Sequence, residues 1–181
     1  IIAFMEQCAA DHGFEVVKDE VENLLIKVPA TPGKEDVPAV CMQGHLDMVP
    51  EKNEETEFDF ETDPIPVYRD GDWLKADGTT LGADNGIGLA MAMAIATDPE
   101  VTHGPLELLF TIDEETGLTG AMALKPGFLE SRKLINIVSE EEGVLFVGCA
   151  GGGDSDIAWA RPRSRSGEKP VFKIQVTGLQ G

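Results

Sequence analysis

Basic residues are scarce in this sequence of 181 residues, which has 14 Lys and Arg against 33 Asp and Glu. The formal net charge is therefore −19 at pH 7. A chain this acidic repels phosphate backbones, so the composition argues against a nucleic-acid partner. Most of the acidic excess is explained by a solvated surface, but a few of the carboxylates are candidates for holding cations.

Cysteine is also rare, and long apolar runs are missing. The three cysteines, Cys8, Cys41 and Cys149, have no CxxC spacing. This pattern argues against a disulfide framework and a zinc ribbon, and it suits a reducing compartment. The apolar stretch at 89–96 is too short and too rich in alanine to span a membrane. We therefore expect a cytoplasmic protein that has no membrane partner.

Enough apolar residues remain for a core, since hydrophobic residues make up 42% of the chain. The almost uninterrupted apolar run at 37–43 and the largely apolar run at 106–112 predict strands that are buried on both faces. Asp70-Gly71 predicts a hairpin turn. Strand-like runs alternate with helix-like segments, which predicts a layered α/β domain. The remaining predicted strands are 14–18, 23–28, 134–138, 144–149 and 171–176, and the predicted helices are 1–12, 87–97 and 118–124.

The two ends of the sequence suggest a piece of a longer protein. The chain opens inside a helix-like pattern without an initiator Met and stops just after a strand-like run. The composition changes at the glycine run 150–153, after which Arg161, Arg163 and Arg165 follow. We therefore expect one domain over residues 1–151 and the beginning of a second over residues 152–181.

His45 and Asp47 follow the predicted strand at 37–43. The two-residue period of a strand puts both side chains on the same face. A neutral imidazole is a good zinc ligand, and a nearby carboxylate can fix its orientation. The pair could equally be an ordinary surface or capping pair. Cys41 lies mid-strand among apolar residues, so we expect a small buried hydrophobe rather than a nucleophile.

Two further positions in the chain carry candidate acidic residues. Asp84 lies just before a predicted helix, where it could cap the helix or bridge two cations. Glu114 and Glu115 follow the predicted strand at 106–112. They could form a solvated turn, or they could be functional carboxylates, one of which binds a metal while the other transfers protons. Because ligands of α/β sheets collect at the carboxyl ends of strands, we expect His45, Asp84 and Glu115 to converge. Their nitrogen and oxygen atoms suit zinc, manganese or cobalt.

Four segments of the sequence resemble the aminoacyl-histidine dipeptidases, the PepD-type branch of the M20 metallopeptidases and relatives of the carnosinases. The segments are GHLDMVPEKN (44–53), DWLKADGTTLGADNGIGLA (72–90), HGPLELLFTIDEETGLTGA (103–121) and INIVSEEEGVLFVGCAGG (135–152). The resemblance covers nearly the whole chain. It implies a three-layer α/β/α zinc-peptidase-like catalytic domain with a mixed sheet, incomplete here, followed by the start of a lid domain.

The resemblance also implies roles for the candidate residues. His45 would bind one zinc ion, Glu115 the other, and Asp84 would bridge the two. Glu114 would be the general base, and Asp47 would orient His45. The Asp84–Asn85 peptide bond is expected to be cis. The implied reaction is the metal-assisted hydrolysis of dipeptides that end in histidine, and the implied assembly is a homodimer formed through the lid.

One position departs from the family pattern. The family carries an aspartate ligand directly before a Ser-Glu pair, and Val138 stands there in this sequence. The second histidine ligand is expected beyond Gly181. We therefore expect this chain alone to bind metal weakly and to hydrolyse little peptide. The alternatives are another M20 peptidase or deacylase, a catalytically impaired relative that serves as a binding or dimerisation module, and an acidic calcium-binding module, although no oxygen-rich calcium loop is present.

Overall fold

The computed structural model describes residues 1–139, 141 and 143–148. Its helices are α1 (Ile2–Asp11), α2 (Ala83–Thr97) and α3 (Thr119–Ala123). Its strands are β1 (Glu15–Lys18), β2 (Leu24–Val28), β3 (Val40–His45), β4 (Val67–Asp70), β5 (Trp73–Ala76), β6 (Leu106–Thr111) and β7 (Lys133–Asn136). The predicted domain boundary at 151/152, the predicted strand at 171–176 and Cys149 lie outside the described residues.

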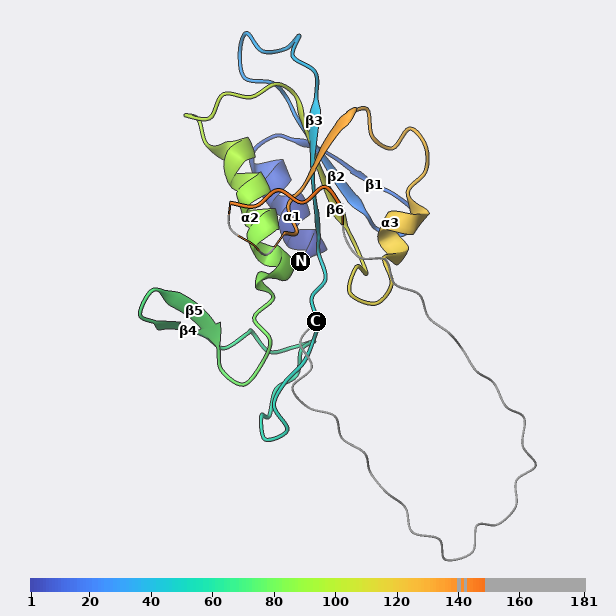
Figure 1. The fold of residues 1–181 in the computed structure, drawn as a ribbon. Coiled ribbons are helices and arrows are strands. Elements are labelled where there is room, and N and C mark those ends of the chain that lie inside the picture. The colour runs from blue at the N-terminus through green and yellow to red at the C-terminus, as the bar shows by residue number, and fades with distance from the viewer. Residues whose placement is uncertain (140, 142, 149–181) are drawn as a thin grey trace, which may run out of the picture. The chain divides into compact units, whose positions relative to one another are not determined.

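Five of the strands form one mixed sheet in the order β1-β2-β6-β3-β7 (Figure 1). Strands β6, β3 and β7 are parallel, whereas β1 and β2 join the sheet antiparallel. Strands β4 and β5 form a separate hairpin that turns at Gly71, as predicted. The α/β class and the mixed sheet predicted from the sequence are confirmed.

Alternation along the strands gives the sheet two apolar faces. One face carries Leu24, Ile26, Leu108 and Phe110, which form the main core with residues of α1 and α2. The opposite face carries Leu25, Cys41 and Leu109, against which Leu124, Phe128 and Leu129 pack. Figure 1 shows α1 and α2 on one side of the sheet and α3 on the other. Burial on both faces explains the continuous apolar runs of β3 and β6.

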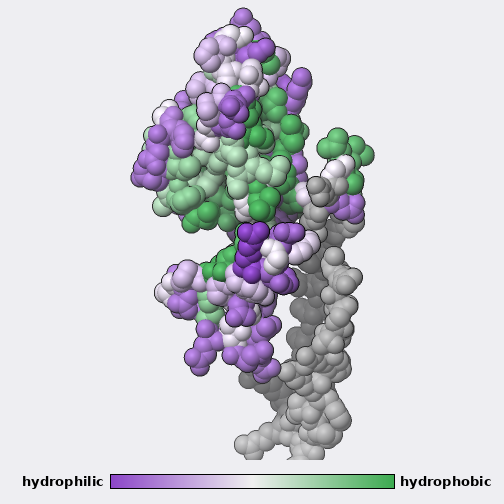
Figure 2. Space-filling model, turned by 90° about the vertical axis from the view of Figure 1, so that its left-hand side faces the viewer, coloured by the Kyte–Doolittle hydropathy of each residue, from purple (hydrophilic) through white to green (hydrophobic). Residues whose placement is uncertain are grey.

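Helix α2 is apolar around most of its circumference. Ala92 and Ala96 are buried against the sheet, where small side chains allow a close approach. Ile87 and Met91 lie on its exposed surface, and Figure 2 shows hydrophobic residues gathered on the face of the molecule where α2 lies. Within the described residues, no helix combines the length and hydrophobicity needed to cross a membrane.

The predicted strand at 144–149 is wrong over its described part. Residues 144–148 are not strand, and Leu145 and Val147 are almost fully exposed. An apolar run becomes a strand only when a neighbouring strand supplies hydrogen-bond partners. Among the described residues, the sheet ends at β7, and no strand pairs with this segment.

Parallel pairing sets the place of the candidate site. His45, the last residue of β3, is in register with Thr111, the last residue of β6. The pairing of β3 with β7 aligns Gln43 with Asn136, and it continues as the N–H of Ile137 donates to the carbonyl of Gln43. Three neighbouring strands thus end at the same edge of the sheet, as the carboxyl ends of parallel strands do.

Candidate metal centre

Three side chains meet at this edge of the sheet. His45 ends β3, Asp84 lies in the first turn of α2, and Glu115 follows β6. Each offers one ligand atom, and these atoms lie within 4.8 Å of one another. Residues far apart in the sequence therefore form a single cluster of nitrogen and oxygen donors, the convergence that the sequence analysis expected.

The hydrogen bonds of His45 fix which ring nitrogen faces the cluster. The side chain is buried, and its Nδ1 lies 3.0 Å from the backbone carbonyl oxygen of Asp47. A carbonyl can only accept, so Nδ1 carries the proton and donates it. In the neutral ring, Nε2 then presents a lone pair, and it lies 2.9 Å from Oδ1 of Asp84. Two electron-pair donors that face each other require a proton or a cation between them.

Asp47 connects the end of β3 to the segment that follows β6. Its Oδ2 accepts a hydrogen bond of 3.0 Å from the backbone N–H of Glu115. Its Oδ1 is buried, lies 3.5 Å from Nδ1 of His45, and accepts no hydrogen bond from the described residues. Asp47 therefore holds His45 mainly through its backbone carbonyl and Glu115 through its carboxylate.

Negative charge accumulates around the cluster. Burial raises the pKa of Glu115, and the charges of Asp84, Glu114 and Asp47 raise it further, with His45 acting in the opposite direction. No Lys or Arg in the described part of the chain forms an ion pair with these carboxylates. A bound divalent cation would offset this repulsion, and the donor set of one imidazole and several carboxylates fits zinc, manganese or cobalt.

Asp84 does not serve as a helix cap. The residue at the N-cap position of α2 is Gly82, which makes no side-chain capping bond. The carboxylate of Asp84 instead faces His45. The backbone of Asp84 and Asn85 is non-helical, and the peptide bond between them is cis, as the resemblance implied. The regular helix therefore begins after Asn85, close to the start that the sequence predicted.

Glu114 lies beside the cluster but is not part of its ligand group. Its backbone carbonyl accepts hydrogen bonds from the N–H groups of Gly117 and Leu118. No hydrogen bond to its carboxylate is found among the described residues. The adjacent carboxylates of Glu114 and Glu115 thus have different surroundings, which suits a division between proton transfer and ligation.

Val138 lies two residues past the last pair of β3 and β7, Gln43 with Asn136, and extending that register places it beside His45. It follows Ile137, whose hydrogen bond to Gln43 continues the pairing of β3 with β7. The half-buried side chain of Val138 offers no ligand atom. Aspartate at this position would add a carboxylate beside His45. The described residues therefore supply three ligands, and Val138 stands where a fourth would be expected.

Two buried asparagines that were not predicted from the sequence hold the backbone around the cluster. The amide of Asn85 bonds to the backbone at His45 and at Ile137. Asn23 accepts from the N–H of Ile112 and donates to the carbonyl of Gly120, so it joins both ends of the segment that carries Glu114 and Glu115. The only signals in the sequence were an Asn beside a candidate ligand and an Asn at the start of a predicted strand. Neither signal distinguishes an asparagine that bonds to distant backbone groups from one that lies in a turn.

Asp113 also stabilises the segment after β6. Its backbone lies in the left-handed region with φ of 56°. Its carboxylate accepts hydrogen bonds from the hydroxyls of Thr116 and Thr119, and these bonds lower its pKa. The turn that presents Glu114 and Glu115 is therefore tied internally as well as to Asn23.

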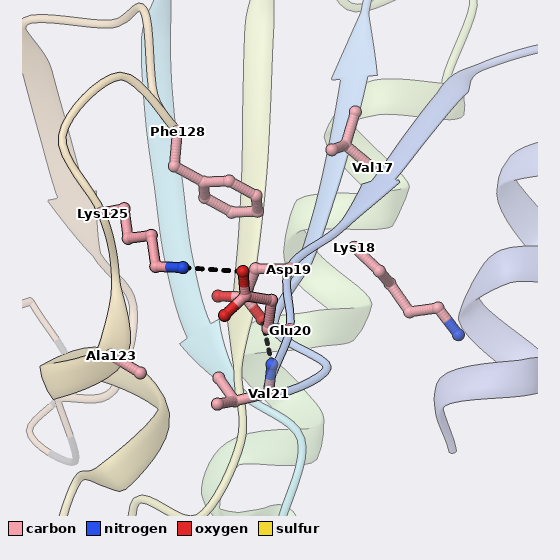
Figure 3. Close-up of a pocket in the computed structure, with 8 residues that line it drawn as sticks. All are labelled: Val17, Lys18, Asp19, Glu20, Val21, Ala123, Lys125 and Phe128. Carbon is pink, nitrogen blue, oxygen red and sulfur yellow. Dashed lines mark hydrogen bonds and ion pairs between the residues drawn. The ribbon is translucent and has the colours of Figure 1, made fainter.

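Other predicted side chains lie away from the cluster. Cys41 is buried in the core, where burial and the charge of Glu107 raise the pKa of its thiol to about 11, so it is an inert thiol as expected. A cavity of about 490 Å³ lies between the β1–β2 turn and the segment after α3 (Figure 3). Lys125 and Glu20 pair across it, but it contains none of the ligand residues.

Comparisons with known proteins point to one peptidase family. A model of the peptidase family M20/M25/M40 matches residues 41–165. The chain is 50% identical over 175 residues to the cytosol non-specific dipeptidase of Escherichia coli (strain K12), an alignment that covers 96% of this chain and 36% of that relative.

Solved structures show the same fold. The aminoacylhistidine dipeptidase of Vibrio alginolyticus superimposes with a TM-score of 0.75 and 51% identity, covering 78% of this chain and 29% of that one. The aminopeptidase PepT of Bacillus cereus superimposes with a TM-score of 0.65 and 26% identity, covering 77% and 37%. The chain thus spans about a third of the length of these relatives.

Proposed function

The chain belongs to peptidase family M20/M25/M40, and from this premise we propose that the intact protein is a metal-dependent dipeptidase. The observation that carries the proposal is the convergence of His45, Asp84 and Glu115. The preferred substrate is an unblocked dipeptide with a C-terminal histidine. The names of two relatives support this choice, since one is an aminoacylhistidine dipeptidase and the other a non-specific dipeptidase.

The proposed cofactor is a pair of zinc ions, with manganese or cobalt as possible replacements. His45 and Asp84 would hold one ion, and Asp84 and Glu115 the other. When bound, the ions would activate water and polarise the scissile carbonyl. Nε2 of His45 is available for this role because Nδ1 donates its proton to the carbonyl of Asp47.

Glu114 is the proposed general base. Its carboxylate accepts a proton from the attacking water and then passes that proton to the leaving amine. Its neighbour Glu115 is held by the bond from its N–H to Asp47, so the two carboxylates keep separate positions. Asp47 is a positioning residue in this scheme, since it fixes both His45 and Glu115 without touching the substrate.

Val138 supports a second candidate function. Without a carboxylate opposite His45, the metal site has one ligand fewer than the family pattern provides. The alternative is therefore a catalytically impaired relative that acts as a binding or dimerisation module. Zinc stoichiometry of the intact protein separates the two functions, because the enzyme would hold about two ions per chain and the impaired relative fewer.

The remaining proposals concern the whole protein. Residues 1–151 would belong to the catalytic domain and residues 152–181 to the start of a lid, through which the intact protein would form a homodimer. The site of action would be the cytoplasm, which agrees with the name of the Escherichia coli relative. Its partners would be small peptides rather than nucleic acid or membrane.

The test compares Ala-His with Ala-Ala, which differ only at the C-terminal residue. The intact protein is stripped with a chelator and then reloaded with Zn²⁺. We expect hydrolysis to disappear with the metal, to return with zinc, and to favour Ala-His. Full activity after chelation would refute metal dependence. Equal hydrolysis of both dipeptides would refute only the preference for histidine.

A further inference from the structure

We propose that Asn85 is a positioning residue whose side-chain amide holds the end of β3, the segment after β7 and the start of α2 in register around the proposed metal ligands. The proposal rests on the proposed metal-dependent function and deepens it. It concerns a residue whose side-chain amide bonds to backbone groups of His45 and Ile137. This residue acts by holding the backbone at His45 and at Ile137 in place.

Both ends of the Asn85 amide are used. The residue is 5% exposed. Its Oδ1 accepts a hydrogen bond of 3.2 Å from the backbone N–H of His45. Its Nδ2 donates a bond of 2.8 Å to the carbonyl of Ile137. The amide therefore connects the end of β3 to the segment that follows β7.

The two backbone partners adjoin functional positions. One is the N–H of His45 itself, and the other is the carbonyl directly before Val138, where the family carries an aspartate ligand. Asn85 also follows Asp84 directly in the chain. One side chain thus ties the backbone at His45 and at Ile137 to the residue that follows Asp84. A shift of His45 relative to Asp84 would alter the 2.9 Å separation of their ligand atoms.

Two glycines make room for this amide. A Cβ atom on Gly44 would lie 2.2 Å from Oδ1 of Asn85. A Cβ atom on Gly88 would lie 2.7 Å from both polar atoms of the amide and 2.5 Å from the carbonyl oxygen of Ile137. The glycines of the GHLD and ADNGIG segments therefore permit the close approach of Asn85 to both strands.

Loss of the amide would leave two backbone groups without partners, the buried N–H of His45 and the partly buried carbonyl of Ile137. Buried backbone groups are nearly always paired, so the chain would shift to find other partners. Groups that orient metal ligands from outside the coordination sphere commonly affect metal affinity by about 10–100-fold. Asn85 is placed to have an effect of this size.

The test compares Asn85→Leu with Leu25→Ala in the intact protein. Leucine has the branched shape of asparagine but is larger and forms no hydrogen bond. Leu25 is buried in the core on the other face of the sheet, so its truncation destabilises the fold away from the cluster. Asn85→Ser removes the same two bonds without adding bulk, and it replaces Asn85→Leu if that variant does not fold.

Two quantities are measured. The first is Zn²⁺ affinity by competition with a chromogenic chelator, which we expect to fall about 10–100-fold in the Asn85 variant and to stay unchanged in Leu25→Ala. The second is amide hydrogen exchange of the metal-free protein. Exchange at the His45 amide should accelerate, whereas the Leu46 amide, which donates to the carbonyl of Thr111, provides the internal control.

Two results would overturn the inference. One is a zinc affinity in the Asn85 variant that equals the wild-type value. The other is an equal loss in Leu25→Ala, which would reveal a general effect of stability. Failure of the proposed function is distinguishable, because then the wild-type protein itself would take up no zinc. The connection between Asn85 and His45 would in that case be refuted or supported by the exchange of the His45 amide.

Discussion

Nε2 of His45 lies 2.9 Å from Oδ1 of Asp84, a residue 39 positions further along the chain. The other ring nitrogen of His45 is occupied by the backbone carbonyl of Asp47. This relationship explains why the sheet edge can hold a cation. The imidazole is turned so that its free lone pair points at the carboxylate of Asp84. A carboxylate oxygen of Glu115 lies within 4.8 Å of the ligand atoms of both residues.

Replacement of Glu114 separates catalysis from metal binding. Glu114→Gln removes the proposed proton acceptor but leaves the three ligand residues intact. We expect kcat for Ala-His to fall by about 10²–10⁴-fold, the usual contribution of general acid–base catalysis, while zinc affinity stays within about twofold. Loss of zinc together with activity would contradict this assignment and would make Glu114 a ligand.

Val138→Asp should tighten metal binding. The new carboxylate would stand opposite His45 and add an oxygen ligand to the cluster. We expect Zn²⁺ affinity, measured by calorimetry, to rise at least tenfold. Val67→Asp adds the same charge to the exposed β4 strand and serves as the matched control. Equal affinities for the two variants would show that Val138 does not face the metal site.

The pH dependence of stability should reflect Glu115. Its pKa is raised in the folded protein by burial and by neighbouring carboxylates, so its ionised form destabilises the metal-free fold. This penalty is present above the folded pKa and disappears as the pH falls toward the ordinary glutamate value. Glu115→Gln should therefore raise the Tm of the metal-free protein at pH 7 and raise it less at pH 4.

The control for that prediction is Glu100→Gln, which alters an exposed carboxylate in the turn after α2. We expect it to leave the Tm nearly unchanged at both pH values. A Tm for Glu115→Gln that equals or falls below the wild-type value at pH 7 would contradict the repulsion inferred for the cluster.

Glu107 should show the opposite sign. Burial alone would raise its pKa, but hydrogen bonds from Ser131 and Glu130 outweigh that effect and lower it. Its stabilising contribution is therefore present above the ordinary glutamate pKa and is lost as the pH falls through the lowered value. Glu107→Gln should cost about 1–3 kcal/mol at pH 7, measured by urea denaturation, and less near pH 3. A constant cost across this range would contradict the prediction.

Continuous apolar runs and the positions of polar residues at their ends made much of the fold predictable. Strands β3 and β6 were evident because burial on both faces leaves few polar residues in their sequence. His45 and Glu115 became candidate ligands because polar groups that directly follow such strands meet at one sheet edge. Asp84 was ambiguous, since the same residue type caps helices, and the structure shows that its carboxylate faces His45 and makes no capping bond.

Long-range hydrogen bonds to the backbone were not predictable. The contacts of Asn85 and Asn23 depend on which main-chain groups the folded chain leaves unpaired, and no local pattern encodes that. The strand prediction for residues 144–148 was wrong for a related reason. Its apolar sequence favours a strand, but strand formation requires a neighbouring edge, which is a property of the whole sheet.

The most direct test of the central claim is a Zn²⁺ titration of the intact protein and of three single variants, His45→Ala, Asp84→Ala and Glu115→Ala. His12→Ala, which alters an exposed histidine after α1, is the control. The convergence of the three side chains predicts that each ligand variant loses zinc affinity by at least tenfold while the control binds like wild type. Wild-type affinity in all three ligand variants would contradict a shared metal centre.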